Sequence, residues 1–226
     1  MTVAERIRST AKSEQTRQRI VSAALELFQS QGFDGATMRH IARHAGVATG
    51  AAYYYFDSKD SLVLEFYRQV QDATFDAVTT EILGQKDLRA RVTVILRAKF
   101  KDFEPHRRWI PALVRNSMDP EHPISPFSKE TREIREKAIR HFEIALAGAS
   151  VKVPKDLKPH LPRLLWMYQM GLILFWIFDR SEGQKKTMLL LEKSLAAVTG
   201  LIQLASLPLT GSLRRNVVQL IEAIET

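Results

Sequence analysis

Residues 37–59, TMRHIARHAGVATGAAYYYFDSK, constrain the fold more than any other part of this chain. The segment opens with Thr37, an oxygen-bearing residue typical of a helix N-cap. Apolar residues then recur at helical intervals, at Met38, Ile41, Ala42 and Ala45. Gly46 follows, and a glycine accepts the left-handed backbone conformation that ends a helix. The pattern predicts a short helix over about 38–45 that stops at a glycine turn.

A second short helix is expected over about 50–56, with Thr49 as its cap. Ala42 and Ala52 are small enough to let the two helices cross closely, as a helix-turn-helix requires. In such a unit the second helix enters the DNA major groove. The residues expected to contact DNA are Thr37, Arg39, Thr49, Gly50, Ala51, Tyr53, Tyr54 and Lys59. The tyrosines can also be explained as core residues, but their place after Gly50 favours contact with DNA.

The pattern over residues 28–59, G-F…T…I-A-x-x-A-G-V…G…Y-x-Y-F-x-S-K, resembles the DNA-binding domain of the TetR family of transcriptional regulators. The matching residues are Phe28, Gly32, Phe33, Thr37, Ile41, Ala42, Ala45, Gly46, Val47, Gly50, Tyr53, Tyr55, Phe56, Ser58 and Lys59. Relatives often carry Ser-Lys before the glycine of the second helix and Thr after it, where this chain has Ala48, Thr49 and Ala51. The departure leaves fewer polar groups for DNA.

The resemblance implies a homodimer that binds double-stranded DNA and is released from it when a small molecule enters the helical body. A ligand changes DNA affinity only by binding two conformations differently. The long helix that starts near Ser58 would carry this coupling. Since family members mostly occupy operators, the resemblance favours a repressor.

The predicted fold class is all-α, with an N-terminal three-helix helix-turn-helix domain and a larger helical domain for ligand binding and dimerisation. We expect a flexible basic arm at 1–13, the DNA-binding domain at 14–57 and the second domain at 58–226. The arm could reach DNA or stay a solvated terminus. Helices are expected over about 14–31, 58–83, 88–103, 107–118, 127–147, 157–178, 182–207 and 212–225.

Composition limits the function only loosely. The net charge of +8 is consistent with a nucleic-acid partner, yet residues 1–60 hold eight Lys and Arg against six acids, a net of only +2. The absence of cysteine excludes disulfides and thiolate metal sites and suits a reducing compartment. The first residues lack the apolar core of a secretion signal, so a cytoplasmic location is expected.

The last long helices carry more apolar surface than one core can cover. The run at 164–178 is too short to span a membrane, so a helix apolar on all sides should be buried on all sides. In the next helix one stripe contains Leu191, Leu195, Val198 and Ile202, and a second contains Leu190, Ala197, Leu201 and Leu204. We expect the second stripe to form a two-fold, four-helix dimer interface.

A ligand pocket is harder to place. Its candidates are the aromatic and apolar residues Phe100, Phe103, Trp109, Phe142, Trp166, Tyr168, Met170 and Trp176. Each of them is as readily explained as core. Such a pocket would prefer an apolar or aromatic compound, while Arg107, Arg108 and Arg115 leave an anionic head group open.

Other functions receive less support. The chain has no G-x-S-x-G, phosphate-binding glycine loop or H-E-x-x-H, so no enzyme and no cofactor are expected. His40 and His44 share a helix face without an evident third ligand, so no metal is expected. The alternative that stays open is a helical protein–protein adaptor that reuses the helix-turn-helix without binding DNA.

Overall fold

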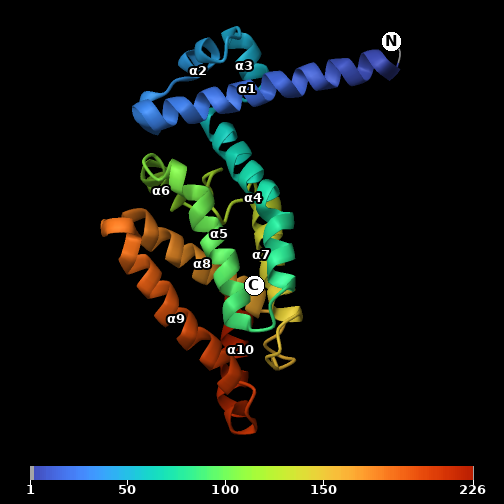
Figure 1. The fold of residues 1–226 in the computed structure, drawn as a ribbon, viewed down its shortest axis with the longest axis vertical. Coiled ribbons are helices and arrows are strands. Elements are labelled where there is room, and N and C mark those ends of the chain that lie inside the picture. The colour runs from blue at the N-terminus through green and yellow to red at the C-terminus, as the bar shows by residue number, and fades with distance from the viewer. Residues whose placement is uncertain (1–2, 226) are drawn as a thin grey trace. The chain divides into compact units, whose positions relative to one another are not determined.

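The computed structural model describes the backbone of residues 3–225, and all regular structure within that range is helical (Figure 1). The chain divides into two compact units, which we describe separately. Unit 1 takes in the chain up to Val70 together with Pro105–Ile134, and unit 2 comprises Gln71–Glu104 and the chain from Arg135 onward. The all-α fold class is therefore confirmed.

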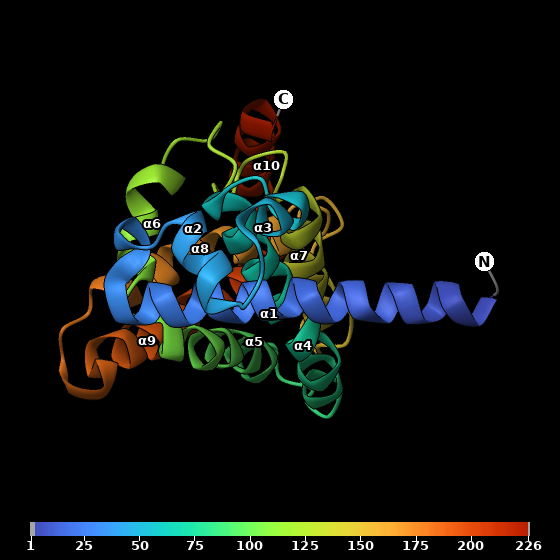
Figure 2. The same cartoon turned by 90° about the horizontal axis from the view of Figure 1, so that it is seen from above.

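Unit 1 is built around the helix-turn-helix, in which α2 packs against both α1 and α3. Seen from above, α1 extends well beyond α2 and α3 toward its N-terminus (Figure 2). The helices of this unit are α1 (Val3–Gly35), α2 (Met38–His44), α3 (Thr49–Tyr55), the first part of α4 (Lys59–Leu83) and α6 (Ile110–Ser117), with the 3-10 helix η1 (Glu104–His106) at its border.

The first helix differs from the expected flexible arm at 1–13. It begins at Val3, because residues 3–31 contain neither glycine nor proline and are rich in Ala, Glu, Arg and Gln, all good helix formers. Residues 1–2 lie outside the described chain. The expected end of this helix near residue 31 is confirmed, since Gly32 has φ +79° and interrupts the helical backbone.

The core of unit 1 is aromatic. Phe28 is fully buried, and its ring centroid lies 5.1 Å from that of Phe33 and 5.2 Å from that of Trp109. Trp109 in turn lies 5.4 Å from Phe66 at the start of α4. Through these contacts α6 packs onto α1, although more than seventy residues separate the two helices.

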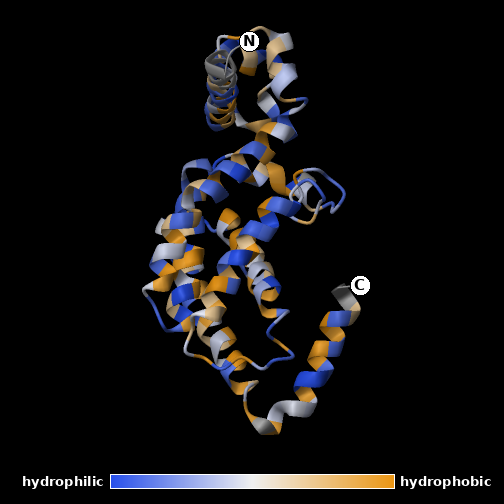
Figure 3. Cartoon of the chain, turned by 90° about the vertical axis from the view of Figure 1, so that its right-hand side faces the viewer, coloured by the Kyte–Doolittle hydropathy of each residue, from blue (hydrophilic) through white to orange (hydrophobic). Residues whose placement is uncertain are grey.

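Unit 2 is a helical bundle in which α5, α8 and α9 pack against one another. Its helices are the second part of α4, α5 (Leu88–Phe103), α7 (Arg132–Ala147), α8 (Leu161–Phe178), η2 (Glu182–Gln184), α9 (Lys185–Leu204), η3 (Pro208–Thr210) and α10 (Gly211–Glu225). α8 and α9 form a helical hairpin (Figure 1), and hydrophobic and hydrophilic turns alternate along α10 (Figure 3).

The predicted helix boundaries hold where local signals are strong. The bounds of α5 match the prediction at both ends. α8 begins later than expected, with Pro162 in its first turn, where a backbone N–H is not needed. α9 also begins later, because Gly183 and Gln184 adopt positive φ angles of 59° and 52° and delay the helix.

Two buried charged side chains fix the frame of unit 2. The guanidinium of Arg91 donates to the carbonyl oxygens of Gln85 and Ile144, each at 2.7 Å, and a Cβ at Gly148 would overlap it. The carboxylate of Asp179 accepts hydrogen bonds from the N–H and hydroxyl groups of Ser181 and Thr187. The first side chain joins the ends of α4 and α7, and the second fixes the α8–α9 hairpin.

The division into units differs from the domain boundary expected at 57/58. Unit 1 keeps α4 as far as Val70 and also includes residues 105–134. The physical reason is the aromatic core, in which Trp109 and Phe66 close over Phe28. Sequence patterns locate helices, but they do not show which distant helix covers which core.

Candidate nucleic-acid interface

The glycine turn of the helix-turn-helix forms as predicted. The hydroxyl of Thr37 caps α2 by accepting from the N–H of His40 at 3.2 Å. Gly46 adopts φ +64°, and its N–H donates to Arg43 while that of Val47 donates to Ala42. These two bonds make a Schellman motif, the usual helix end in which a left-handed residue satisfies the last carbonyls.

The start of α3 differs from the prediction. Thr49 was expected to cap the helix, but it is the first helical residue, and Ala48 occupies the N-cap position with no side-chain hydrogen bond. Alanine has no oxygen to offer the free N–H groups at this helix start. Those N–H groups are therefore open to an acceptor from outside the chain.

The outward face of α3 is dominated by two tyrosines. Tyr54 is 83% exposed and Tyr53 is 51% exposed, whereas Ala52 and Phe56 are buried beneath them. The hydroxyl of Tyr55 lies 3.1 Å from that of Ser13 on α1. α3 is thus fastened from behind, and its exposed face carries ring surface with hydroxyl tips. Gly50 is exposed and Ala51 half-buried, so neither obstructs close approach.

Arg19 is a contributor that the sequence analysis missed. Its Nη2 donates to the carbonyl oxygens of Ala45 at 2.9 Å and Gly46 at 3.3 Å. A cation at the C-terminal end of a helix satisfies the last carbonyls and interacts favourably with the helix dipole. The sequence showed only that Arg19 lies off the apolar face of α1, which is insufficient to predict this contact with the turn.

Lys59 was expected to be free to contact DNA, but its side chain is bonded within unit 1. Its ammonium donates to the backbone carbonyl oxygen of Phe33 at 2.7 Å and lies 4.4 Å from the centroid of the Phe33 ring. The side chain ties the start of α4 to the break after Gly32. Among the other predicted contacts, Thr37, Arg39 and Thr49 are exposed.

A buried ion pair joins α1 to α4 inside unit 1. Both guanidinium nitrogens of Arg17 donate to the carboxylate of Glu65, which Arg68 and Gln69 also contact. Burial alone would raise the pKa of Glu65, but these hydrogen bonds and the charges of the two arginines hold the pKa below its ordinary value. The pair fixes α4 to the helix that carries the helix-turn-helix.

The predicted pocket residues do not gather around one cavity. Trp109 belongs to the core of unit 1. The residues buried in unit 2 are Phe100, Phe142, Trp166 and Trp176, and those half-buried there are Phe103, Tyr168 and Met170. Phe100 stacks on Trp176 at 5.7 Å, and the Tyr168 hydroxyl lies 2.6 Å from that of Ser194.

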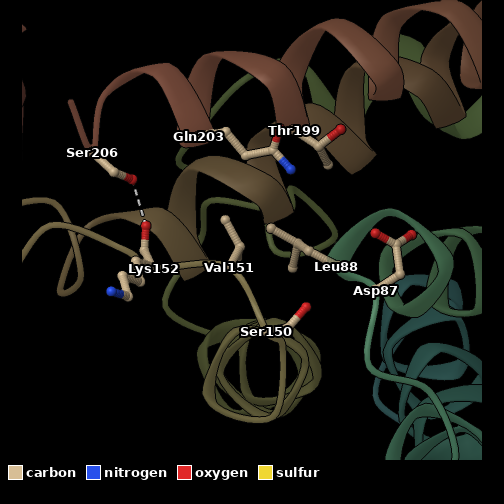
Figure 4. Close-up of a pocket in the computed structure, with 8 residues that line it drawn as sticks. All are labelled: Asp87, Leu88, Ser150, Val151, Lys152, Thr199, Gln203 and Ser206. Carbon is tan, nitrogen blue, oxygen red and sulfur yellow. Dashed lines mark hydrogen bonds between the residues drawn. The ribbon is translucent and has the colours of Figure 1, made fainter.

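Unit 2 has a cavity of about 300 Å³ lined by none of these eight residues (Figure 4). Its lining consists of Asp87, Leu88, Ser150, Val151, Lys152, Thr199, Gln203 and Ser206. The Ser206 hydroxyl already donates to the carbonyl oxygen of Lys152, and the carboxylate of Asp87 accepts from the N–H of Ala90. These polar groups serve the local frame.

The two stripes of α9 differ in exposure. Leu191, Leu195 and Ile202 are buried, whereas Leu201 is 64% exposed and Leu204 51% exposed. The neighbouring helix α8 has an exposed stripe of its own at Met167, Gly171, Leu174 and Phe178. The hairpin therefore presents an apolar face that unit 2 leaves uncovered.

Two segments are long and apolar enough to cross a membrane by length and composition alone, namely Leu161–Phe178 and Glu182–Leu204. Both belong to the α8–α9 hairpin, and each has one face buried in unit 2. Buried core helices of this length pass the same test, so the finding is weak support for a membrane span.

A glycine turn followed by a short helix with an exposed face defines this chain as a helix-turn-helix protein. Comparison with known families agrees. Residues 20–66 match the family described as bacterial regulatory proteins, tetR family, and residues 91–217 match the family described as tetracyclin repressor-like, C-terminal domain. Since the second match alone spans more than half of the chain, the protein belongs to the TetR family.

Similar proteins match this chain over very different lengths. The transcriptional regulator SrpR of Pseudomonas putida is 52% identical over 52 residues, which are 23% of this chain and 24% of SrpR. This relative is thus matched over about a quarter of its length. A tetR-family regulator from Streptomyces coelicolor has a similar fold, with TM-score 0.59 and 22% identity over 93% of this chain and 89% of that one.

A second solved structure with a similar fold is the transcriptional regulator FadR from Bacillus subtilis, in complex with stearoyl-CoA. Its TM-score is 0.57, with 14% identity over 79% of this chain and 95% of that one. At such identities the two structures support the fold, while the residues of the helix-turn-helix are supported by the sequence matches.

Proposed function

We propose that this protein is a dimeric, DNA-binding transcriptional regulator, a repressor that leaves a palindromic operator when a small, mostly apolar ligand binds. The observation that carries the proposal is the outward face of α3. Tyr53 and Tyr54 are exposed there, although large aromatic side chains are usually buried, and the helix beneath them is fastened by Tyr55 and Phe56. A rigid helix with exposed amphipathic rings suits contact with phosphates and base edges.

The proposed DNA contacts are Thr37, Arg39, Thr49, Gly50, Ala51, Tyr53 and Tyr54, with Lys59 in support through Phe33. Polar groups are fewer than in a typical reading helix. We therefore expect the tyrosines to carry a large share of the affinity.

Dimerisation follows from the uncovered face of the α8–α9 hairpin. We propose that Leu190, Ala197, Leu201 and Leu204 pack against the same residues of a second copy. For a two-fold dimer to bind one duplex, its two copies of α3 must lie one DNA turn apart, about 34 Å, or a multiple of this. The operator should accordingly be palindromic. An apolar hairpin covered in this way fits a protein of the cytoplasm better than one of the membrane.

The proposed response to a ligand rests on membership of the TetR family and on the helical unit 2 of this chain. The similar FadR structure holds an acyl-CoA, so the fold can accommodate a ligand with a long apolar part. We propose a small apolar or aromatic effector for this chain as well. Regulation of this kind requires binding and conformational change, and it involves no catalytic step.

The test is selection of bound fragments from random DNA, followed by gel-shift measurements on the selected site. Tyr53→Ala and Tyr54→Ala should each weaken binding by about tenfold with the dimer intact. Tyr54→Phe serves as the matched control, since it keeps the ring and removes only the hydroxyl. Unchanged affinity in both alanine variants would remove α3 from the interface.

The competing adaptor hypothesis makes the opposite prediction about salt. A DNA regulator should lose affinity steeply as salt rises, because phosphate contacts release counterions. Arg39→Met should reduce the slope of log K against log salt by about one. If no fragment is enriched by selection and retention on DNA is independent of salt, the adaptor hypothesis is favoured.

A further inference from the structure

Unit 2 contains a group of polar side chains, some buried and some half-buried, that neither the proposed dimer face nor the cavity uses. They come from three helices, and we call them the Lys99 cluster, consisting of Gln71 and Thr74 on α4, Lys99 and Asp102 on α5, and His141 on α7. All five belong to unit 2. Polar groups concentrated at one place in an otherwise apolar helical body need a physical reason.

Hydrogen bonds between α4 and α5 join members of the cluster in pairs, and His141 on α7 bonds the backbone of α4. Lys99 Nζ donates to Gln71 Oε1 at 2.9 Å, and Thr74 hydrogen-bonds Asp102. His141 Nε2 lies 3.3 Å from the carbonyl oxygen of Phe75, and the two rings stack at 4.5 Å. The bond to a carbonyl requires the histidine to donate from Nε2. The cluster is thus an ordered arrangement with fixed donors and acceptors.

Two atoms of the cluster lack a hydrogen-bond partner among the described residues. Gln71 is 2% exposed, yet its Nε2 donates to nothing. Asp102 Oδ2 is likewise buried without a donor. An unpaired polar atom away from water is costly, so native structures rarely keep one without a use. The cluster therefore holds one free donor and one free acceptor, on the two residues that interact with Lys99.

Burial shifts the charges of the cluster in a consistent way. Removal from water lowers the pKa of Lys99 to about 8, an effect that Asp102 opposes. It also raises the pKa of Asp102 and lowers that of His141. Each group is held closer to neutrality than in water, and an ion of opposite sign next to Lys99 would restore its charge.

Aromatic rings border the cluster. Lys99 Nζ lies 5.4 Å from the ring centroid of Phe103, and Phe75 stacks on His141. Phe103, Lys99 and Asp102 are only half-buried, so the cluster can be reached from the surface of unit 2. The surroundings suit a ligand with an apolar or aromatic body and a polar head.

The chain also places the cluster next to every crossing between the two units. Gln71 follows directly after Val70, the last residue of unit 1 on α4. Asp102 lies three residues before Pro105, and His141 lies on α7, which leaves unit 1 after Ile134. The cluster therefore lies on the three helices whose chain continues into unit 1.

We propose that the Lys99 cluster binds the carboxylate head of the effector, a small monocarboxylate with an apolar or aromatic body. The Lys99 ammonium and the free Gln71 Nε2 donate to the carboxylate oxygens, and Asp102 accepts from a neighbouring hydroxyl where the ligand carries one. This assignment rests on the proposed ligand-responsive function and specifies the chemistry that such a ligand must have.

The experiment measures binding to the full-length protein without DNA, by calorimetry at pH 7. The probes are benzoate, 2-hydroxybenzoate, phenylacetate and octanoate, with toluene and benzylamine as the uncharged and cationic comparisons. We expect at least one carboxylate to bind and 2-hydroxybenzoate to exceed benzoate. Lys99→Met and Gln71→Leu should each weaken that binding at least tenfold.

Lys101→Met is the matched control, because it removes the same charge from an exposed position on the same helix and should leave binding unchanged. Circular dichroism on each variant separates lost binding from lost folding. The assignment is overturned if no carboxylate binds, if the variants bind as well as the parent, or if benzylamine binds in preference. Failure to bind any DNA would instead contradict the proposed function, since the calorimetry does not depend on it.

Discussion

Glu65 in unit 1 is a buried acidic side chain and Asp102 in unit 2 a half-buried one, and their surroundings differ. Glu65 receives hydrogen bonds from two arginines and a glutamine, which hold its pKa low. Asp102 keeps one oxygen without a partner, and burial raises its pKa. The carboxylate of Glu65 is thus fully paired within unit 1, whereas that of Asp102 is paired only in part within unit 2.

The exposed surfaces of the two units differ in a parallel way. α3 exposes tyrosines, which combine apolar rings with hydroxyl groups, and α9 exposes leucines without any polar atom. A surface of the first kind suits a hydrated polyanion, and one of the second kind suits another apolar surface. The difference supports the proposal that DNA binds through unit 1 and that a second copy of the chain binds through unit 2.

The largest effect is expected at the apolar face. Leu201→Glu places a carboxylate at the proposed two-fold interface in both copies, and each buried unpaired charge costs several kcal/mol. The variant should sediment as a monomer at micromolar concentration, and its affinity for a palindromic site should fall at least about 100-fold. Leu209→Glu, at a 95% exposed position on η3, is the control and should remain a dimer. A dimeric Leu201→Glu would move the interface elsewhere.

The next effect tests the internal pairing of unit 1. Arg17→Met leaves the buried Glu65 with weaker partners, and the free energy of unfolding at pH 7 should drop by about 3 kcal/mol. Because the folded-state pKa of Glu65 is lowered, its contribution is present above the ordinary pKa of 4.5 and lost as pH falls through the folded value.

Urea unfolding at pH 7 and near pH 3 measures both parts of this prediction. The gap between parent and variant should narrow in acid. Adding Glu65→Gln to Arg17→Met should restore part of the stability at pH 7, since it removes the unpaired charge. A constant gap across pH would show that Arg17 acts by packing alone.

A smaller effect is expected at the glycine turn. Gly46→Ala forces a side chain into φ +64°, which costs about 1–2 kcal/mol, although the space around it is open. Gly50→Ala is the matched control, because this glycine is helical and has no atom within 4 Å of an added Cβ. It should gain roughly 0.5–1 kcal/mol of stability. Equal effects at both glycines would contradict the role of the turn.

These variants also show what the sequence could and could not predict. The helix-turn-helix was predicted almost residue by residue, since Thr37, Gly46 and the apolar spacing act over a few residues. Thr49 does not cap α3, because the helix begins at Thr49 itself and Ala48 takes the N-cap position in an extended conformation.

Long-range contacts explain the remaining differences. Trp109 was predicted to line a ligand pocket, yet it fills the core of unit 1. The apolar periodicity of the segment around Trp109 does not show which distant helix this side chain contacts. The doubled stripe of α9 was predicted because it is a property of one helix. The Lys99 cluster was missed, since its members lie up to 70 residues apart and each looks ordinary alone.

The smallest effect concerns the charge of Lys99 itself. Its folded-state pKa is lowered to about 8 from an ordinary 10.5, so between these values the unfolded chain binds a proton that the folded chain lacks. Stability should therefore rise with pH across this window in the parent more than in Lys99→Met. We expect a difference under about 1 kcal/mol between pH 8 and 9, because the half-buried side chain is partly solvated. Asp102, Lys137 and His141 also lie near this site. Because they are present in both the parent and Lys99→Met, their contributions to the pH dependence largely cancel. Identical slopes in urea unfolding would mean that Lys99 is as solvated as a surface lysine.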